Sequence, residues 1–244
     1  MFTRTIELTF QTQNLVVKVC NLSSKITFVP VFFQHQINDT TRLGIWKIEE
    51  TEDFFKANVP QHRDVTHPHK RLQHLAGRFL LQFLFPDFPY ELIQIADTRK
   101  PYLPDERYHF SISHCGDYAA AIVSSDKRVG VDIENVSPKI ETIKNKFLSE
   151  KELTTYLPTA IGTAVTGSGP GLSTIDSRLT TLLWSAKESV FKWYGDGGVD
   201  FKQNIQLQKH HKATESIDCF FSKTNSQLAI HYRYFGQLVL AWVD

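Results

Sequence analysis

The sequence predicts an α+β fold, and two kinds of apolar spacing support this prediction. Residues 68–85 and 179–194 place apolar side chains three and four positions apart, as in helices with one buried face. Shorter runs alternate apolar and polar side chains, which is typical of half-buried strands. These strand-like runs follow one another in groups, and no internal repeat is visible in the sequence.

The first predicted elements lie between Val31 and Phe85. A strand begins at Val31, and a short helix is expected near 49–57. A longer helix covers 68–85, because proline is well tolerated in a first helical turn. Its buried face consists of six apolar side chains at helical spacing: Leu72, Leu75, Ala76, Phe79, Leu80 and Phe83.

The middle of the chain combines strands with one capped helix. Four strands are predicted, at 92–96, 108–113, 118–124 and 129–134. Ser149 and Glu152 have the spacing of a capping box, which predicts a helix as far as Leu157. Residues 159–177 are rich in Gly, Ser and Thr and are predicted to form a mobile loop. Beyond the helix at 179–194, four more strands are predicted, at 205–208, 217–222, 228–234 and 238–243.

Composition restricts the possible classes of function. The chain has 244 residues, 41% of them hydrophobic and 22% charged, which is ordinary for a globular protein. A net charge of +1 does not favour a nucleic-acid or membrane binder. The three cysteines are far apart, and no run of 18 apolar residues or signal-peptide pattern occurs. We therefore expect a cytoplasmic protein with reduced thiols that binds neither nucleic acid nor membranes, and we expect a monomer.

The predicted strand 129–134 presents two carboxylates on one face. Side chains alternate along a strand, so Asp132 and Glu134 share a face with Gly130, while the three β-branched residues share the other. Two like charges roughly 7 Å apart repel each other unless a cation lies between them. The glycine is expected to leave open space above it, and Mg²⁺ suits such oxygen ligands.

The predicted helix 179–194 contains a lysine on its apolar side. Leu183, Val190 and Tyr194 form an apolar stripe, and Lys187 falls inside it. A charge in that position is costly unless it is paired or reaches a polar rim. Glu188 and Lys192 form an i,i+4 pair worth about 0.3–0.5 kcal/mol, which does not account for Lys187.

Five sequence blocks together resemble the Sfp-type 4'-phosphopantetheinyl transferases. The signature pair is Gly130-Val131-Asp132-Ile133-Glu134 followed by Trp184-Ser185-Ala186-Lys187-Glu188-Ser189-Val190-Phe191-Lys192. Three further blocks match in the same order: Arg99-Lys100-Pro101-Tyr102, Phe110-Ser111-Ile112-Ser113-His114-Cys115-Gly116 and Phe147-Leu148-Ser149-Glu150-Lys151-Glu152. Arg99 stands where the family usually has glycine. The resemblance covers the chain from about Val31 to the C-terminus and excludes the first thirty residues.

The resemblance implies a pseudo-twofold fold of two similarly folded halves, each a small antiparallel sheet packed with helices. The halves would be joined near residues 125–128. Residues 31–127 would form the N-terminal half, with contacts to the nucleotide of coenzyme A. Residues 128–244 would form the C-terminal half, with the metal site, the catalytic helix and the flexible loop 159–177. Residues 1–30 would be an extension of uncertain order.

The resemblance also implies an activity. Members of the family transfer the 4'-phosphopantetheine group of coenzyme A to a serine of an apo acyl or peptidyl carrier protein and release 3',5'-ADP. This chain would therefore be a Mg²⁺-dependent transferase of the holo-[acyl-carrier-protein] synthase type, with Mn²⁺ as an alternative cation. Its partner would belong to fatty-acid, polyketide or nonribosomal peptide biosynthesis.

Site residues follow from the positions that match the family's motifs. Asp132, Glu134 and Glu188 would bind the metal. Glu188, directly or through a water, would accept the proton of the attacking serine, and Lys192 and His114 complete the predicted catalytic set. The residues expected to bind coenzyme A are Arg71, Lys100, Ser113, His114, Lys187 and Lys192.

Three other classes of function remain to be weighed. Four histidines at positions 62, 67, 69 and 74 could suggest a zinc enzyme, although their spacing fits no single helical face. A non-catalytic module that binds coenzyme A or a carrier protein would not need three carboxylates. Another Mg²⁺-dependent phosphate-transfer enzyme is disfavoured, because the chain lacks the glycine-rich loop that ends in Gly-Lys.

Overall fold

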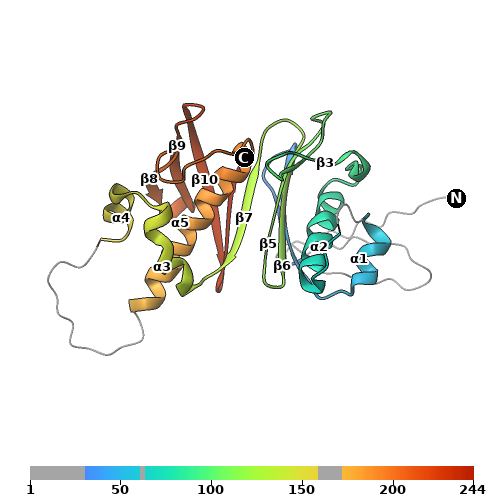
Figure 1. Cartoon of the computed structure of the whole chain (residues 1–244), viewed down its shortest axis with the longest axis horizontal. Coiled ribbons are helices and arrows are strands. Elements are labelled where there is room, and N and C mark those ends of the chain that lie inside the picture. The colour runs from blue at the N-terminus through green and yellow to red at the C-terminus, as the bar shows by residue number, and fades with distance from the viewer. Residues whose placement is uncertain (1–30, 61–63, 159–171) are drawn as a thin grey trace.

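The chain forms two antiparallel sheets that stand back to back between two layers of helices (Figure 1). The computed structural model describes residues 31–60, 64–158 and 172–244. Helix α2 (Pro68–Leu84) covers the outer face of one sheet, and α5 (Leu172–Tyr194) covers the outer face of the other. Helix α1 (Glu52–Asn58) packs against α2, and α3 (Pro138–Phe147) packs against α5. The predicted α+β fold of two halves, each with a sheet and helices, is confirmed. The predicted extension 1–30 and most of the predicted loop 159–177 lie outside the described residues.

The first sheet has the strand order β1-β2-β6-β5, and the second has the order β7-β11-β10-β9-β8. The strands of the first sheet are β1 (Phe33–Gln36), β2 (Thr41–Lys47), β5 (His109–Cys115) and β6 (Tyr118–Ser124). Those of the second sheet are β7 (Gly130–Asn135), β8 (Ile205–His211), β9 (Ser216–Phe221), β10 (Ser226–Phe235) and β11 (Leu238–Val243). A separate hairpin joins β3 (Gln94–Ile95) to β4 (Pro101–Tyr102).

The helices are α1 (Glu52–Asn58), α2 (Pro68–Leu84), α3 (Pro138–Phe147), α4 (Glu150–Tyr156) and α5 (Leu172–Tyr194). The predicted capping box is present, because Ser149 Oγ accepts from Glu152 N–H while the Glu152 carboxylate accepts from Ser149 N–H. Two predictions need correction. Helix α3 was not expected, and residues 172–177 belong to α5 rather than to a loop. In the described part of the chain no helix combines the length and apolar character needed to cross a membrane.

Apolar packing occurs in three layers. One cluster joins α2 to the first sheet through Leu80, Trp46 and Ala121, and a second joins α5 to the second sheet through Val190 and Ile217. A third cluster fills the space between the sheets, and its members include Leu43, Ile122, Val131, Ile133 and Leu240. The predicted faces of the strand 129–134 are therefore confirmed, since its β-branched side chains lie between the sheets.

Strands β5 and β7 join the two halves through side chains. The hydroxyl of Ser111 accepts a hydrogen bond from Val131 N–H at 3.2 Å, and the hydroxyl of Ser113 accepts one from Ile133 N–H at 3.2 Å. Cys115 Sγ accepts from Asn135 N–H, also at 3.2 Å. Alternate side chains of β5 thus bind alternate N–H groups of β7, which satisfies these donors. We call this contact between the two halves, along β5 and β7, the seam.

Helix α5 lies directly on the backbone of β7. A Cβ atom added at Gly130 would lie 2.1 Å from Ser189 O and 2.5 Å from Trp193 N. The sequence-based expectation of open space above Gly130 is therefore wrong, because the helix backbone occupies that space. Only a residue without a side chain allows this approach.

A buried ion pair attaches α5 to α4 and β8. The Lys187 side chain is fully buried, and its Nζ lies 2.8 Å from Glu152 Oε1. The same ammonium donates to Phe201 O at 2.8 Å and to Ile205 O at 2.7 Å. Glu152 also accepts from Leu207 N–H at 2.9 Å, so both charges have several partners.

We predict that Gly130→Ala lowers the free energy of unfolding by about 3 kcal/mol, because the added methyl group overlaps the α5 backbone. Urea unfolding followed by circular dichroism measures this change. The control is Gly236→Ala, where an added Cβ meets nothing within 4 Å and φ is +61°. It should cost only the roughly 1 kcal/mol of a left-handed residue. Equal losses for the two variants would contradict the close approach at Gly130.

We predict that Lys187→Met lowers the free energy of unfolding by about 3–5 kcal/mol, because it leaves the Glu152 carboxylate buried without its cation. The double variant Lys187→Met/Glu152→Gln should lose less than the sum of the single variants in a double-mutant cycle. Lys151→Met, at an exposed position on α4, should stay within about 0.5 kcal/mol of the parent. A Lys187→Met protein of parental stability would show that the ion pair contributes nothing.

Candidate active site

Asp132 lies at the seam between the halves and is surrounded by donors. Its Oδ1 accepts from Ser113 Oγ at 2.9 Å and from Lys192 Nζ at 2.6 Å. Its Oδ2 accepts from Ser185 Oγ at 2.8 Å. Only 4% of its side chain is exposed, so the position of this carboxylate is fixed by strands β5 and β7 and by helix α5.

Glu134 and Glu188 complete a group of three carboxylates. Burial, followed by the charges of Asp132 and Glu134, raises the pKa of Glu188 to about 7, and Lys192 opposes this rise. Burial and the charge of Asp132 also raise the pKa of Glu134. The indole N–H of Trp184 is 3.4 Å from Glu134 Oε1. The charges of both strand carboxylates therefore act on the helical glutamate.

Residues of the first half hold the C-terminal end of α5. Lys100 Nζ donates to Lys192 O at 2.7 Å, and Thr98 Oγ1 donates to Gly195 O at 3.0 Å. Burial, and next the charge of Arg128, lower the pKa of Lys100 to about 8. Cations are favourable at a helix C-terminus, where carbonyl groups lack intrahelical partners. Lys100 thus positions the last turn of α5, which contains Lys192.

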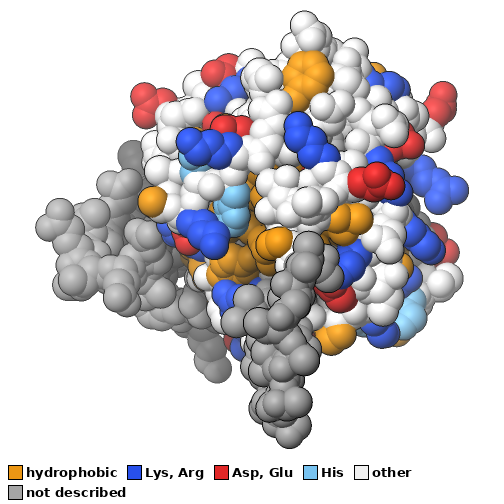
Figure 2. Space-filling view, turned by 90° about the vertical axis from the view of Figure 1, so that its left-hand side faces the viewer, with side chains coloured by type: hydrophobic (Ala, Val, Ile, Leu, Met, Phe, Trp, Pro, Cys, Tyr) orange, Lys and Arg blue, Asp and Glu red, His pale blue; other side chains and the backbone are white. Residues whose placement is uncertain are grey.

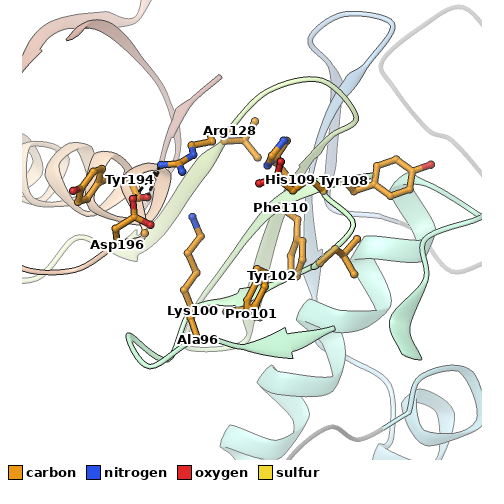
Figure 3. A pocket seen from close by; sticks show the side chains of 14 residues that line it. Ala96, Lys100, Pro101, Tyr102, Tyr108, His109, Phe110, Arg128, Tyr194 and Asp196 are labelled. Atoms are coloured by element: carbon orange, nitrogen blue, oxygen red, sulfur yellow. Dashed lines mark hydrogen bonds and ion pairs between the residues drawn. The ribbon is translucent and has the colours of Figure 1, made fainter. Parts of the chain in front are cut away.

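Two neighbouring cavities meet at Lys100. One, of about 230 Å³, is lined by Lys192, Ser111 and Phe191. Arg99 also lines it, and its backbone is in the left-handed region, with φ of +66°. The other, of about 270 Å³, lies between the two halves. Figure 3 shows Lys100 pointing into it, with Arg128 and Asp196 on one side and His109 and Phe110 on the other. The seam between the halves is therefore hollow on both sides of Lys100.

The remaining predicted coenzyme A contacts lie in varied settings. The prediction that Lys187 contacts a substrate phosphate needs correction. Its ammonium is enclosed in the core and donates to three protein oxygens. Arg71 pairs with both oxygens of Glu52, each at 2.8 Å. Ser113 contacts Asp132 and Lys192, and His114 is exposed near the end of β5. For these three residues, substrate binding stays a prediction.

The carboxylates suit a hard divalent cation by their chemistry. Three oxygen donors, two of them with raised pKa values, would gain from a cation that neutralises their mutual repulsion. They do not form a finished coordination shell, because among the described residues no group of three or more His, Cys, Asp or Glu is arranged to hold a metal ion. Metal binding therefore stays a prediction. That finding also gives the zinc alternative no support in the described region, although His62 lies outside it.

Sequence reasoning missed several residues of the site. Ser185 holds Asp132 Oδ2, and Trp184 contacts Glu134, although both belong to a motif that was recognised. Cys115 contributes to the seam next to Glu134, and burial raises the pKa of its thiol to about 11. The available signal was spacing: Ser111, Ser113 and Cys115 alternate along β5, so they must share one face.

Known proteins with similar sequences identify the family. Residues 128–243 match the family model of the 4'-phosphopantetheinyl transferase superfamily. Enterobactin synthase component D of Escherichia coli (strain K12) is 33% identical over 176 residues, which are 70% of this chain and 75% of that protein. The protein of the same name from Salmonella austin is 28% identical over 185 residues, or 72% of each chain. The chain therefore belongs to the 4'-phosphopantetheinyl transferase superfamily.

Proposed function

We propose that this protein transfers the 4'-phosphopantetheine group of coenzyme A to a serine of an apo acyl or peptidyl carrier protein. The reaction would depend on Mg²⁺ and release 3',5'-ADP, as in a holo-[acyl-carrier-protein] synthase. Family membership supports phosphopantetheinyl transfer in general. The observation that carries the proposal is the ion pair of Lys192 with Asp132, together with the influence of the Asp132 and Glu134 charges on buried Glu188.

The acidic, basic and hydroxyl side chains of the seam have different proposed roles. Asp132, Glu134 and Glu188 would hold Mg²⁺, which when bound would neutralise negative charge on the diphosphate of coenzyme A. Lys192, the partly exposed cation of this group, would bind a phosphate oxygen. Ser113 and Ser185 would keep the Asp132 carboxylate in place through their hydroxyl groups. Positioning and charge neutralisation are the main requirements of phosphoryl transfer.

Glu188 is the residue that we propose as the proton acceptor. The serine oxygen of the carrier protein would attack the phosphorus that bears pantetheine, and its proton would pass to the Glu188 carboxylate, directly or through a water. The bond from that phosphorus to the bridging oxygen would break, and 3',5'-ADP would leave with the bonding electrons. Without a cation, burial raises the pKa of Glu188 to about 7, and a cation bound to the same carboxylate would lower this pKa and favour the ionised form that accepts a proton.

The surface of the second half is consistent with a protein partner. On the face shown in Figure 2, Lys and Arg side chains are interspersed with Asp and Glu, and hydrophobic side chains gather near the centre. A surface of mixed charge does not attract a polyanion such as nucleic acid. We propose a carrier protein as the partner, and coenzyme A as the small-molecule substrate.

The test is incubation with a panel of apo carrier proteins, coenzyme A and Mg²⁺, followed by intact-protein mass spectrometry. At least one carrier should gain the mass of phosphopantetheine, and EDTA should abolish the gain. We predict that Asp132→Asn and Glu188→Gln each lower the initial rate by about 100-fold or more, because the first loses a charged ligand of Mg²⁺ and the second loses the proton acceptor.

Glu150→Gln is the matched control, since Glu150 is an exposed carboxylate in the first turn of α4. It should keep the parental rate. Circular dichroism of each variant checks that the loss of activity does not come from unfolding. Calorimetric binding of coenzyme A without a mass gain on any carrier would favour a non-catalytic binding module and contradict the proposed function.

A further inference from the structure

The Asp132 carboxylate has few acceptor positions left for a metal ion. Oδ1 already accepts from Ser113 Oγ and from the Lys192 ammonium, and Oδ2 accepts from Ser185 Oγ. The Nζ–Oδ1 distance of 2.6 Å is that of a strong charge-assisted hydrogen bond. A divalent cation on the same oxygen would be repelled by the ammonium group. Oδ2 keeps one acceptor position, but a cation bound there would still lie close to the Lys192 ammonium on Oδ1, so Asp132 binds a cation better once Lys192 has moved away.

Lys192 is the donor that is able to move. Ser113 and Ser185 are buried, and the Ser113 hydroxyl is also held by Ile133 N–H at 3.2 Å. A quarter of the Lys192 side chain is exposed, and its four-carbon stem is flexible. The same residue lines the cavity of about 230 Å³ that opens beside Lys100. Rotation of this flexible side chain is the change that would carry the ammonium from Asp132 toward the cavity.

The Lys192 ammonium can leave Asp132 only if an anion is present at its new position. An ammonium without a counter-charge is poorly placed in a largely apolar cavity, so the exchange is favourable only when a ligand supplies the negative charge. A phosphate of coenzyme A would supply it, and Asp132 would then be free for the cation. Each ligand would thus favour the arrangement of Lys192 that the other requires.

We propose that Lys192 occupies the cation's position on Asp132 in the ligand-free protein, and that the divalent cation and coenzyme A bind cooperatively because Lys192 exchanges between Asp132 and a substrate phosphate. The second part of this inference rests on the proposed function. The first part concerns only Lys192, Asp132 and the cation. By linkage, the factor by which coenzyme A raises cation affinity equals the factor by which the cation raises coenzyme A affinity.

The experiment titrates the full-length protein with Mn²⁺ alone, and the electron paramagnetic resonance signal of free Mn²⁺ gives the Kd. Lys192→Met should bind Mn²⁺ about 10-fold more tightly than the parent, because the competing ammonium is gone. Adding coenzyme A should tighten Mn²⁺ binding to the parent about 10-fold, a coupling within the usual range, and should have little effect on Lys192→Met. Asp132→Asn should weaken Mn²⁺ binding in both backgrounds, which shows that the titrated site is this one.

Two controls keep the result interpretable. Lys146→Met removes one exposed positive charge from α3 and should leave the Kd for Mn²⁺ unchanged, which excludes an effect of net charge. Lys192→Gln replaces the ammonium by a neutral amide, and it is the variant to use if circular dichroism shows that Lys192→Met does not fold. It too should bind Mn²⁺ more tightly than the parent.

Equal or weaker Mn²⁺ binding by the folded Lys192 variant overturns the proposal, because it means that Lys192 does not compete for Asp132. Equal coupling in parent and variant overturns the proposed exchange. These outcomes differ from a failure of the proposed function, in which the parent binds no coenzyme A and modifies no carrier. In that case the titration with Mn²⁺ alone still decides whether Lys192 and the cation compete.

Discussion

Three side chains of β5 hold β7, and the candidate site depends on them. Ser111, Ser113 and Cys115 bind successive alternate N–H groups of β7, so they set the register between two sheets that otherwise meet through apolar packing. A shift by one residue would turn all three side chains away from their donors. The correct register places Ser113 beside Asp132. These three side chains of the Phe110–Gly116 block therefore have a structural role in joining the two halves.

Helix α5 is held from several directions, and this fixes the residues it contributes. Gly130 allows its backbone to lie against β7, and Lys187 attaches its middle to Glu152. Lys100 binds a carbonyl of its last turn from the other half of the molecule. The ammonium groups of Lys187 and Lys100 both donate hydrogen bonds to backbone carbonyl groups inside the protein. Lys192 differs, because within the described part of the chain its ammonium contacts only side chains, at a partly exposed site.

The sequence predicted those features that depend on local periodicity. Strand 118–124, helix α2 and the two faces of β7 follow from apolar spacing, and they agree with the structure. Periodicity did not reveal the partner of Lys187, because Glu152 is 35 residues away and had a sufficient explanation in the capping box. The space above Gly130 was misjudged for a similar reason. A missing side chain is compatible with an open site and with a close helix, and only tertiary packing decides between them.

The charges at the seam explain why a cation is expected there. One ammonium faces three carboxylates, and burial keeps water from weakening their repulsion. The ligand-free protein relieves part of that repulsion by placing Lys192 on Asp132 and by raising the pKa of Glu188. Neither response satisfies all three acids, since a single ammonium reaches only Asp132 at hydrogen-bond distance among the described contacts. A divalent ion could contact several of them at once, so the repulsion that remains without it becomes a source of affinity for it.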